Sequence, residues 1–239
     1  MLQSSHESIA EGTLVPMPPA ITHRVAEALA ALYRHPERAL LPWYRYAIYS
    51  ALTTDHHADR LAARAWIDIV AVRHVLFCWR PAAHDWPSSW LQPEQLLALA
   101  EQLILGGVDR SHVRMAVNRA QALADVAGEE ASSRHYCSWC VYEAALRALQ
   151  NAWSFSQSWA NCEASGALVD TTTAMDDAST YAAIAVAGGT WQPLSSSASA
   201  SAGGKGRWDW QTDEAQLRRA VFWEWWLRDA VPAAWDRAA

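Results

Sequence analysis

Residues 222–235 of the 239-residue chain read FWEWWLRDAVPAAW, and this stretch decides the fold. At helical spacing, its large apolar side chains point around nearly the whole circumference, and they are Phe222, Trp223, Trp225, Trp226 and Leu227. A helix with bulky apolar residues on all sides has to be surrounded by other helices. Pro232 removes one backbone hydrogen bond, so we expect the helix to kink or end there and Trp235 to pack separately.

The rest of the sequence predicts further helices, each bounded by a capping residue, a proline or a glycine. They are expected from Thr22 to Tyr33, from Pro42, from Leu61 to Trp79, from Pro93 to Gly106, from Asp109 to Gly128, from Ser132 or Ser133, from Asp176 or Asp177 to Gly188, and from Thr212. The two helices from Pro93 and Asp109 should form an antiparallel hairpin. The helix from Ser132 or Ser133 is apolar on two faces, which places it in the middle of a bundle.

The remaining segments predict irregular structure. Ser154 to Ala174 is polar and is expected to be a loop, while Ser195 to Gly206 is rich in Ser, Ala and Gly and has little means of burying surface. Alternating runs of β-branched residues are absent, so we expect no strands. The predicted fold class is therefore all-α: a single-domain bundle of about eight helices with a buried, Trp-rich C-terminal helix. The domain should span residues 22–239, after a flexible segment 1–21 and with a mobile loop at 192–211.

Composition restricts the class of protein. Apolar residues make up 51% of the chain and charged residues 18%, which excludes disorder for most of it. The best candidate for a membrane span, Trp66 to Trp79, is short and contains Asp68, Arg73 and His74. The first residues carry neither the basic nor the apolar region of a secretion signal. We therefore expect a cytoplasmic protein with no membrane association, whose four cysteines are reduced thiols.

Negative charge is concentrated in one part of the sequence. From Asn151 to Gly204 there is no Lys or Arg, whereas Glu163, Asp170, Asp176 and Asp177 supply four negative charges. Such a segment repels the phosphates of nucleic acids and attracts a basic protein surface. We therefore expect no nucleic-acid partner and a basic protein partner.

Residues with catalytic or metal-binding potential do not form a recognisable site. Cys137 and Cys140 form a C-x-x-C pair, but no second pair and no βαβ pattern accompany it, and both fall on the inward stripe of a helix. His74 lies beside Val70 and Phe77 and is interpreted as a core histidine rather than a catalytic base. We therefore predict no enzymatic activity, no metal site and no cofactor.

A second group of residues is typical of a binding surface. It combines carboxylates that lack local counter-charges with aromatic residues in or beside predicted loops, and its members are Asp170, Asp176, Asp177, Tyr181, Trp191, Trp208 and Trp210. Trp and Tyr supply much of the energy at protein interfaces. In an alternative interpretation, Asp176 and Asp177 only cap a helix. A protein-binding module fits these residues better than an enzyme does.

The closing motif Phe222-Trp223-Glu224-Trp225-Trp226-Leu227, followed by Ala230, Pro232 and Ala234-Trp235, resembles that of the predicted bacterial immunity proteins of polymorphic toxin systems, in the class numbered five. Other segments agree in order, and they are Tyr44-Arg45 with Ile48-Tyr49, His74-Val75-Leu76 with Trp79, Pro93-Glu94-Gln95-Leu96-Leu97, Val108-Asp109-Arg110, and Tyr181-Ala182-Ala183 leading to Ala187-Gly188-Gly189. The resemblance spans about Tyr44 to Trp235. It implies a mostly α-helical protein that binds and neutralises a cognate toxin.

Three functional hypotheses follow. In the first, an immunity protein occludes the active site of a toxin with the acidic, aromatic surface around Asp170 to Trp210; the basic channel of a nuclease toxin would complement that surface. In the second, a helical adaptor without a toxin receives a partner helix against its Trp-rich terminal helix. In the third, His74, Cys78 and neighbouring tryptophans line the pocket of an all-helical, cofactor-binding enzyme. We favour the first.

Overall fold

A computed structural model describes residues 16–36, 38–53, 58–80, 91–130, 136–165, 178–188, 190–193, 206–209 and 212–238. For residues 53, 58–61, 127–130, 157–165, 190–193 and 206–209 it describes the backbone alone. The helices in these ranges are α1 (Pro19–Arg34), α2 (Pro42–Thr53), α3 (Ala58–Val75) with the 3₁₀ turn η1 (Leu76–Cys78), α4 (Pro93–Ile104), α5 (Arg110–Glu130), α6 (Tyr136–Ser165), α7 (Ala178–Ala187), and α8 (Asp213–Trp225), which continues through the π-helical η2 (Trp226–Ala230) into α9 (Val231–Ala238). The predicted all-α bundle is confirmed. None of these helices is both long and apolar enough to cross a membrane.

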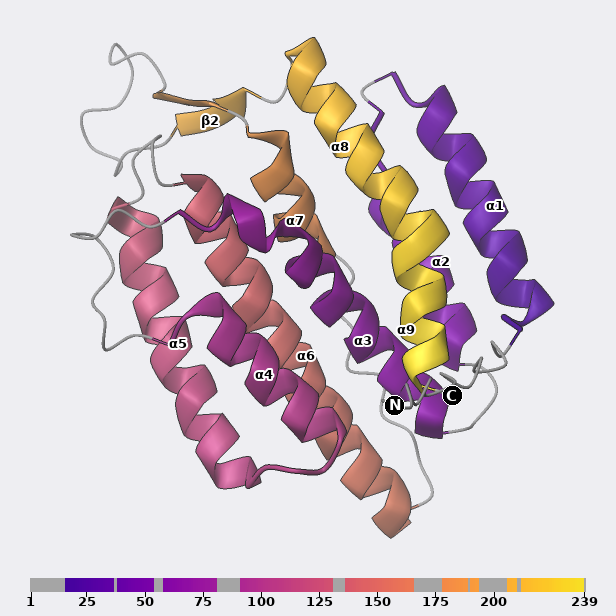
Figure 1. The fold of residues 1–239 in the computed structure, drawn as a ribbon, viewed down its shortest axis with the longest axis vertical. Coiled ribbons are helices and arrows are strands. Elements are labelled where there is room, and N and C mark those ends of the chain that lie inside the picture. Colours follow the sequence, from indigo (N-terminus) through magenta and orange to yellow (C-terminus); the bar gives the residue numbers. More distant parts are fainter. Residues whose placement is uncertain are drawn as a thin grey trace, which may run out of the picture.

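The helices enclose one core (Figure 1). Helix α6 packs against α3, α4, α5 and α7, in agreement with its two apolar faces. Helices α4 and α5 are consecutive, as expected of a helical hairpin, but each packs mainly on α6. The terminal helix lies between α1 and α3 in Figure 1, with α9 packed on α3 and α8 on α7. The core therefore joins segments from the whole length of the sequence.

The terminal helix is buried as its sequence predicts. Phe222, Trp223, Trp226 and Trp235 are all nearly inaccessible to solvent, whereas Trp225 is half-buried. Pro232 does not end the helix, which was one of the two expected outcomes, because the chain passes through the π-helical η2 and then continues as α9. The N–H of Val231 donates to the carbonyl of Trp226, five residues back. This wider turn leads into Pro232, which has no N–H to donate, and lets the helix continue.

Two segments differ from their predicted structure. Helix α6 continues through residues 154–165, which were expected to be a loop, so that it is 30 residues long. Residues 190–193 and 206–209 form two short antiparallel strands, β1 (Thr190–Pro193) and β2 (Gly206–Asp209), although no strand was expected. Four-residue strands are too short to show an alternating pattern. The predicted mobile loop at 192–211 therefore includes strand residues at both ends, and its middle part lies outside the described residues.

Helix α4 ends just before Gly106, as the sequence predicts. Gly106 has a φ of +72°, and its N–H donates to the carbonyl of Leu103 at 3.3 Å. The N–H of Gly107 donates to the carbonyl of Gln102 at 2.7 Å. This pair of hydrogen bonds satisfies carbonyls at the helix end, and a residue without a Cβ adopts the left-handed conformation without strain.

A buried carboxylate connects five parts of the bundle. Asp68 in α3 is 1% exposed and accepts hydrogen bonds from Tyr49 of α2 at 3.2 Å, Ser179 of α7 at 3.2 Å and Asn151 of α6 at 2.6 Å. Ser179 in turn accepts one from Trp226 Nε1 of η2 at 2.9 Å. A buried charge is tolerated only when hydrogen bonds replace its hydration. The relative positions of α2, α3, α6, α7 and η2 are therefore linked through one side chain.

Removal of this carboxylate should destabilise the whole bundle. We expect Asp68→Ala to lower the free energy of unfolding by about 3–5 kcal/mol, because three donors lose their common acceptor inside the core. Asp125→Ala, which removes an exposed carboxylate on α5, should cost about 0.5 kcal/mol or less. Urea unfolding followed by tryptophan fluorescence measures both. Equal midpoints for the two variants would contradict a central role for Asp68.

Candidate functional site

The structure describes only part of the predicted binding surface. Tyr181 has a described side chain, in α7. Trp191 and Trp208 are described as backbone, and they are opposite each other in the register of β1 and β2. The structure thus brings together two predicted site residues that are separated in sequence. Four further members lie outside the described residues, and they are Asp170, Asp176, Asp177 and Trp210.

Helix α7 positions Tyr181 from within the bundle. Several sides of the helix are buried, and the buried residues, such as Ala178, Ala182 and Ala183, are small. Neighbouring helices therefore approach α7 closely. Its consecutive residues contact different neighbours. Ser179 binds Asp68 of α3, and Thr180 Oγ1 accepts a hydrogen bond from the buried Arg45 of α2 at 2.8 Å. Tyr181 is directed toward α6. These contacts fix the rotation of α7 and with it the direction of the tyrosine.

Tyr181 lies against an aromatic and cationic surface of α6. Its ring meets that of Trp139 edge to face, with centroids 5.9 Å apart and planes at 87°. The guanidinium carbon of Arg147 lies 5.9 Å from the Tyr181 ring centroid, within the range of a cation–π contact. Trp139 also contacts Tyr136 at 5.2 Å between centroids. We call Tyr136, Trp139, Arg147 and Tyr181 the Tyr181 cluster, and each of its members is half-buried.

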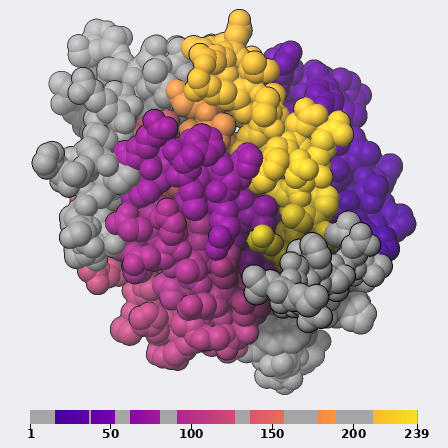
Figure 2. All heavy atoms as spheres, in the orientation of Figure 1, coloured from indigo at the N-terminus to yellow at the C-terminus, as the bar shows by residue number. Residues whose placement is uncertain are grey.

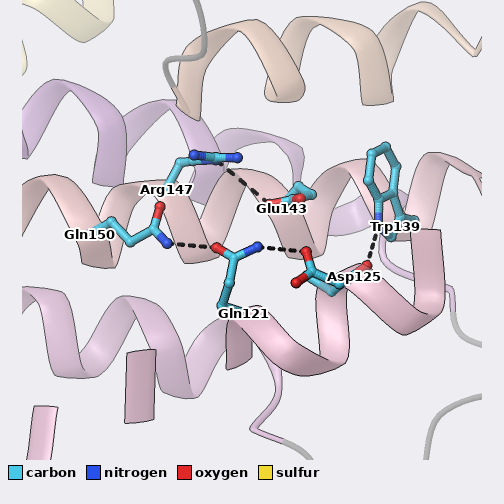
Figure 3. Close-up of polar contacts among 7 residues, drawn as sticks. Gln121, Asp125, Trp139, Glu143, Arg147 and Gln150 are labelled. Atoms are coloured by element: carbon cyan, nitrogen blue, oxygen red, sulfur yellow. Dashed lines mark hydrogen bonds and ion pairs between the residues drawn. The ribbon is translucent and has the colours of Figure 1, made fainter. Parts of the chain in front are cut away.

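Helix α5 supports this cluster from the other side. The indole N–H of Trp139 donates to the carbonyl of Ala124 at 3.1 Å. Figure 3 shows a second connection, in which Gln150 donates to Gln121 at 2.8 Å and Gln121 to Asp125 at 2.8 Å. The hydrogen bonds from Trp139 and Gln150 hold α6 to α5, and the first of them restricts the rotamer of Trp139. Tyr181 therefore packs on a rigid platform.

The buried Glu143 lies next to Arg147 and offsets the positive charge of the Tyr181 cluster. Its carboxylate lies 3.7 Å from the Arg147 Nε, one helical turn away (Figure 3). Burial, together with the neighbouring Cys140 and Tyr181, raises the pKa of Tyr136, so its phenol stays neutral at physiological pH. The cluster presents aromatic surface and a locally neutralised cation. These features suit a packed protein contact, and no nucleophile and base are held together in it.

Sequence reasoning identified Tyr181 and missed its neighbours. Trp139 belonged to the second apolar stripe of the central helix, and Glu143 and Arg147 have the i,i+4 spacing of a helical ion pair. Both signals were present in the sequence. However, α7 begins 31 positions after Arg147 in the sequence. No local pattern indicated that α7 packs along this face of α6.

The cysteines of the C-x-x-C pair are embedded in the structure. Cys140 is buried and Cys137 is half-buried on α6, and Cys137 lies near enough to Cys78 of η1 to contribute to the raised pKa of that thiol. Burial raises the pKa of Cys78 to about 11, and it also raises the pKa values of Cys137 and Cys140. Redox-active cysteines need the opposite shift, toward the thiolate. The geometry therefore favours the structural interpretation of this pair.

The interpretation of His74 as a core residue was wrong. His74 is exposed on α3, and its ring stacks on that of Trp225 with centroids 3.6 Å apart and planes at 11°. Partial burial lowers the pKa of His74, against a smaller opposing effect of Asp229. Consecutive helical residues differ in direction by about 100°, and it is Val75, next to His74, that points into the core. In the described part of the chain, no group of three or more His, Cys, Asp and Glu residues is arranged to hold a metal ion.

The contribution of Tyr181 to stability can be separated from its contribution to binding. We expect Tyr181→Ala to destabilise the fold by about 1–2 kcal/mol, since the ring contacts with Trp139 and Arg147 are lost at a half-buried position. Tyr181→Phe keeps the ring and should cost less than about 1 kcal/mol. Thermal unfolding monitored by circular dichroism distinguishes the variants. Identical melting temperatures for Tyr181→Ala and the natural chain would refute the packing described above.

The raised thiol pKa values predict slow modification. In a Cys162→Ser background, the remaining thiols should react with a chromogenic disulfide roughly 100-fold more slowly in the folded than in the urea-unfolded chain at pH 8. Because the pKa of Cys78 rises from 9.0 to about 11 on folding, the folded state holds this proton more tightly. Its contribution to stability is complete below pH 9 and is lost as the pH rises toward 11. Rapid labelling of the folded protein would show that the thiols are accessible and ionised.

Comparison with known proteins adds an independent result. No curated protein matches the chain. The profile of a protein family described as immunity protein Imm5 matches residues 26–233, which is most of the sequence. The matched range extends from within α1 into α9 and so covers α7, the Tyr181 cluster and the buried Trp223 and Trp226 of the terminal helix. The chain therefore belongs to the immunity protein Imm5 family.

Proposed function

We propose that this protein binds a cognate bacterial toxin in the cytoplasm and neutralises it by occluding its active site. The observation that carries the proposal is the family match over residues 26–233. The chemistry of the chain supports it, since the structure describes a surface suited to protein contact in the Tyr181 cluster. An immunity protein needs a rigid, preformed surface, because each ordered side chain that is already fixed before binding reduces the entropic cost of association.

The contact surface is proposed to include Asp170, Asp176, Asp177, Tyr181, Trp191, Trp208 and Trp210. Two features support this choice. The sequence from Asn151 to Gly204 contains four carboxylates and no Lys or Arg, and Tyr181 lies within that range. In addition, β1 follows directly after α7, and its pairing with β2 brings Trp191 and Trp208 into register. Acidic groups around aromatic anchors would complement a basic toxin, such as a nuclease with a cationic substrate channel.

The adaptor hypothesis loses its main support in the structure. It required the tryptophans of the terminal helix to receive a partner helix, but Trp223, Trp226 and Trp235 are buried against helices of this chain. A partner could reach them only after the bundle opened. Full protection of α8 and η2 in amide hydrogen exchange would agree with the toxin-binding proposal.

Co-expression with a cognate toxin tests the function directly. We expect growth of the host to be restored and a stable complex to elute in gel filtration. Asp68→Ala, which weakens the bundle, serves as the control for folding-dependent rescue. Failure of the natural chain to rescue growth and to form a complex would refute the proposal.

Association kinetics test the contact surface. The double variant Asp176→Lys, Asp177→Lys should associate with a basic toxin about 10-fold or more slowly at low salt, with a smaller difference at high salt, because electrostatic steering is screened. The matched control Glu94→Lys, Asp236→Lys makes the same change of charge at exposed positions of α4 and α9. Equal rates for the two double variants would place the contact elsewhere on the protein.

A further inference from the structure

The strands β1 and β2, which we call the ribbon, stand on the ends of two packed helices. Helix α7 ends at Ala187, and β1 begins three residues later at Thr190. Strand β2 ends at Asp209, and α8 begins four residues later at Asp213. Because Thr190 is paired with Asp209, the end of the ribbon where these two residues meet is the end that joins the helices. Helices α7 and α8 pack against each other, and Figure 2 shows α7 (orange) at the surface beside α8 (gold).

The ribbon needs support where it joins the helices. A two-stranded antiparallel ribbon is only marginally stable on its own in water. It carries Trp191 and Trp208, two residues of the proposed toxin contact, at paired positions. A binding residue that is not held in one direction loses part of its binding energy to ordering when the partner associates. The contact that fixes the chain where it leaves α7 therefore affects binding.

Arg218 of α8 lies against the end of α7. Gly188 follows the last residue of α7 and has a φ of +64°, and its N–H donates to the carbonyl of Ile184 at 3.4 Å. A Cβ built on Gly188 would lie 3.2 Å from Arg218 Nη1, so the guanidinium covers this glycine. The last carbonyls of a helix carry partial negative charge, and an arginine beside them stabilises the helix end. The absence of a side chain at Gly188 leaves room for the guanidinium.

The same guanidinium is close to two further segments. Burial raises the pKa values of Cys78 of η1 and Cys137 of α6, and the positive charge of Arg218 opposes both rises. Such an effect requires proximity, because it falls with distance. Arg218 is also paired with Glu214, one turn earlier on α8, which restricts its rotamer. Arg218 thus lies where η1, the start of α6, the end of α7 and the first turns of α8 meet.

We propose that Arg218 is a positioning residue: by covering Gly188 it fixes the direction in which the chain leaves α7, and so holds Trp191 and Trp208 in place for the toxin. The inference rests on the proposed toxin-binding function and adds to it a residue outside the predicted contact surface. The Arg218 side chain is 52% exposed, so its replacement should loosen the ribbon without opening the core.

Amide hydrogen exchange of the full chain tests the positioning without any toxin. We expect Arg218→Ala to speed exchange in peptides that contain β1 and β2 by about 10-fold, while exchange in α3 stays unchanged. Arg218→Lys keeps a cation at the end of α7 and should restore most of the protection. Arg228→Ala, which removes the arginine of the other i,i+4 pair of the terminal helix, is the matched control and should leave the ribbon unchanged. Unchanged exchange of the ribbon in Arg218→Ala would overturn the proposal.

A double-mutant cycle tests the consequence for toxin binding. Arg218→Ala should raise the dissociation constant of the toxin complex about 5-fold to 10-fold, mainly through faster dissociation. In a Trp191→Ala, Trp208→Ala background, the same substitution should change the constant less than about 2-fold, because a positioning residue acts only through the residues that it positions. An equal loss in both backgrounds would show that Arg218 acts independently of the ribbon, and this would overturn the proposal.

The same measurements separate the positioning role from the toxin-binding function. If the natural chain binds the toxin and Arg218→Ala binds it equally tightly, the positioning role is refuted while the immunity function stands. If the natural chain binds no toxin, both proposals fail. Urea unfolding should give equal midpoints for Arg218→Ala and Arg228→Ala. A clearly lower midpoint for Arg218→Ala would show a general loss of stability in place of a local effect on the ribbon, and it would also refute the positioning role.

Discussion

The hydrogen bonds to Asp68 are the constraint on which the rest of the structure depends. A single carboxylate in α3 accepts from side chains of α2, α6 and α7, and through Ser179 it is connected to the indole of Trp226. Apolar packing alone would allow these helices several similar arrangements, because alanines and tryptophans fill space without strict direction. Hydrogen bonds to a buried charge are directional and costly to leave unmade. They therefore select one register of the helices.

Helix α7 connects the hydrogen bonds of Asp68 with the proposed contact surface at Tyr181. Ser179 is bound to the core, Thr180 to the buried Arg45, and Tyr181 to the platform of Trp139 on α6. Three successive residues thus connect the centre of the bundle with the proposed toxin contact.

The sequence predicts the helices well where their boundaries carry chemical signals. Pro42 and Pro93 begin α2 and α4, Gly106 ends α4, and Thr212 caps α8 through a hydrogen bond to the N–H of Ala215. Residues 154–165 lack apolar periodicity, and they nevertheless continue α6. The strands β1 and β2 are equally difficult to predict, since backbone pairing rather than side-chain pattern defines them.

The polar core and the surroundings of the candidate site could not be predicted for a different reason. In the sequence, Asp68 stands on a polar helix face with Arg60 and Arg64, and its partners Asn151 and Ser179 lie more than eighty residues away. Tyr181 was identifiable as an aromatic residue in an acidic segment, but its contacts with Trp139 and Arg147 depend on how α7 docks on α6. Such contacts follow from tertiary packing, which local patterns do not encode.

The π-helical turn also determines which changes of length the chain tolerates. In an uninterrupted α-helix, Trp226 and Trp235 would point in roughly opposite directions, because nine residues rotate by about two and a half turns. The wider turn in η2 changes this rotation, and both indoles are buried. Loss of one residue from η2 would let a regular α-helix form, because a π-helical turn accommodates one extra residue and leaves the helix after it close to its original direction. Homologous chains should therefore tolerate a difference of one residue at this turn, with the π-helical turn in the longer chains and a regular α-helix in the shorter ones.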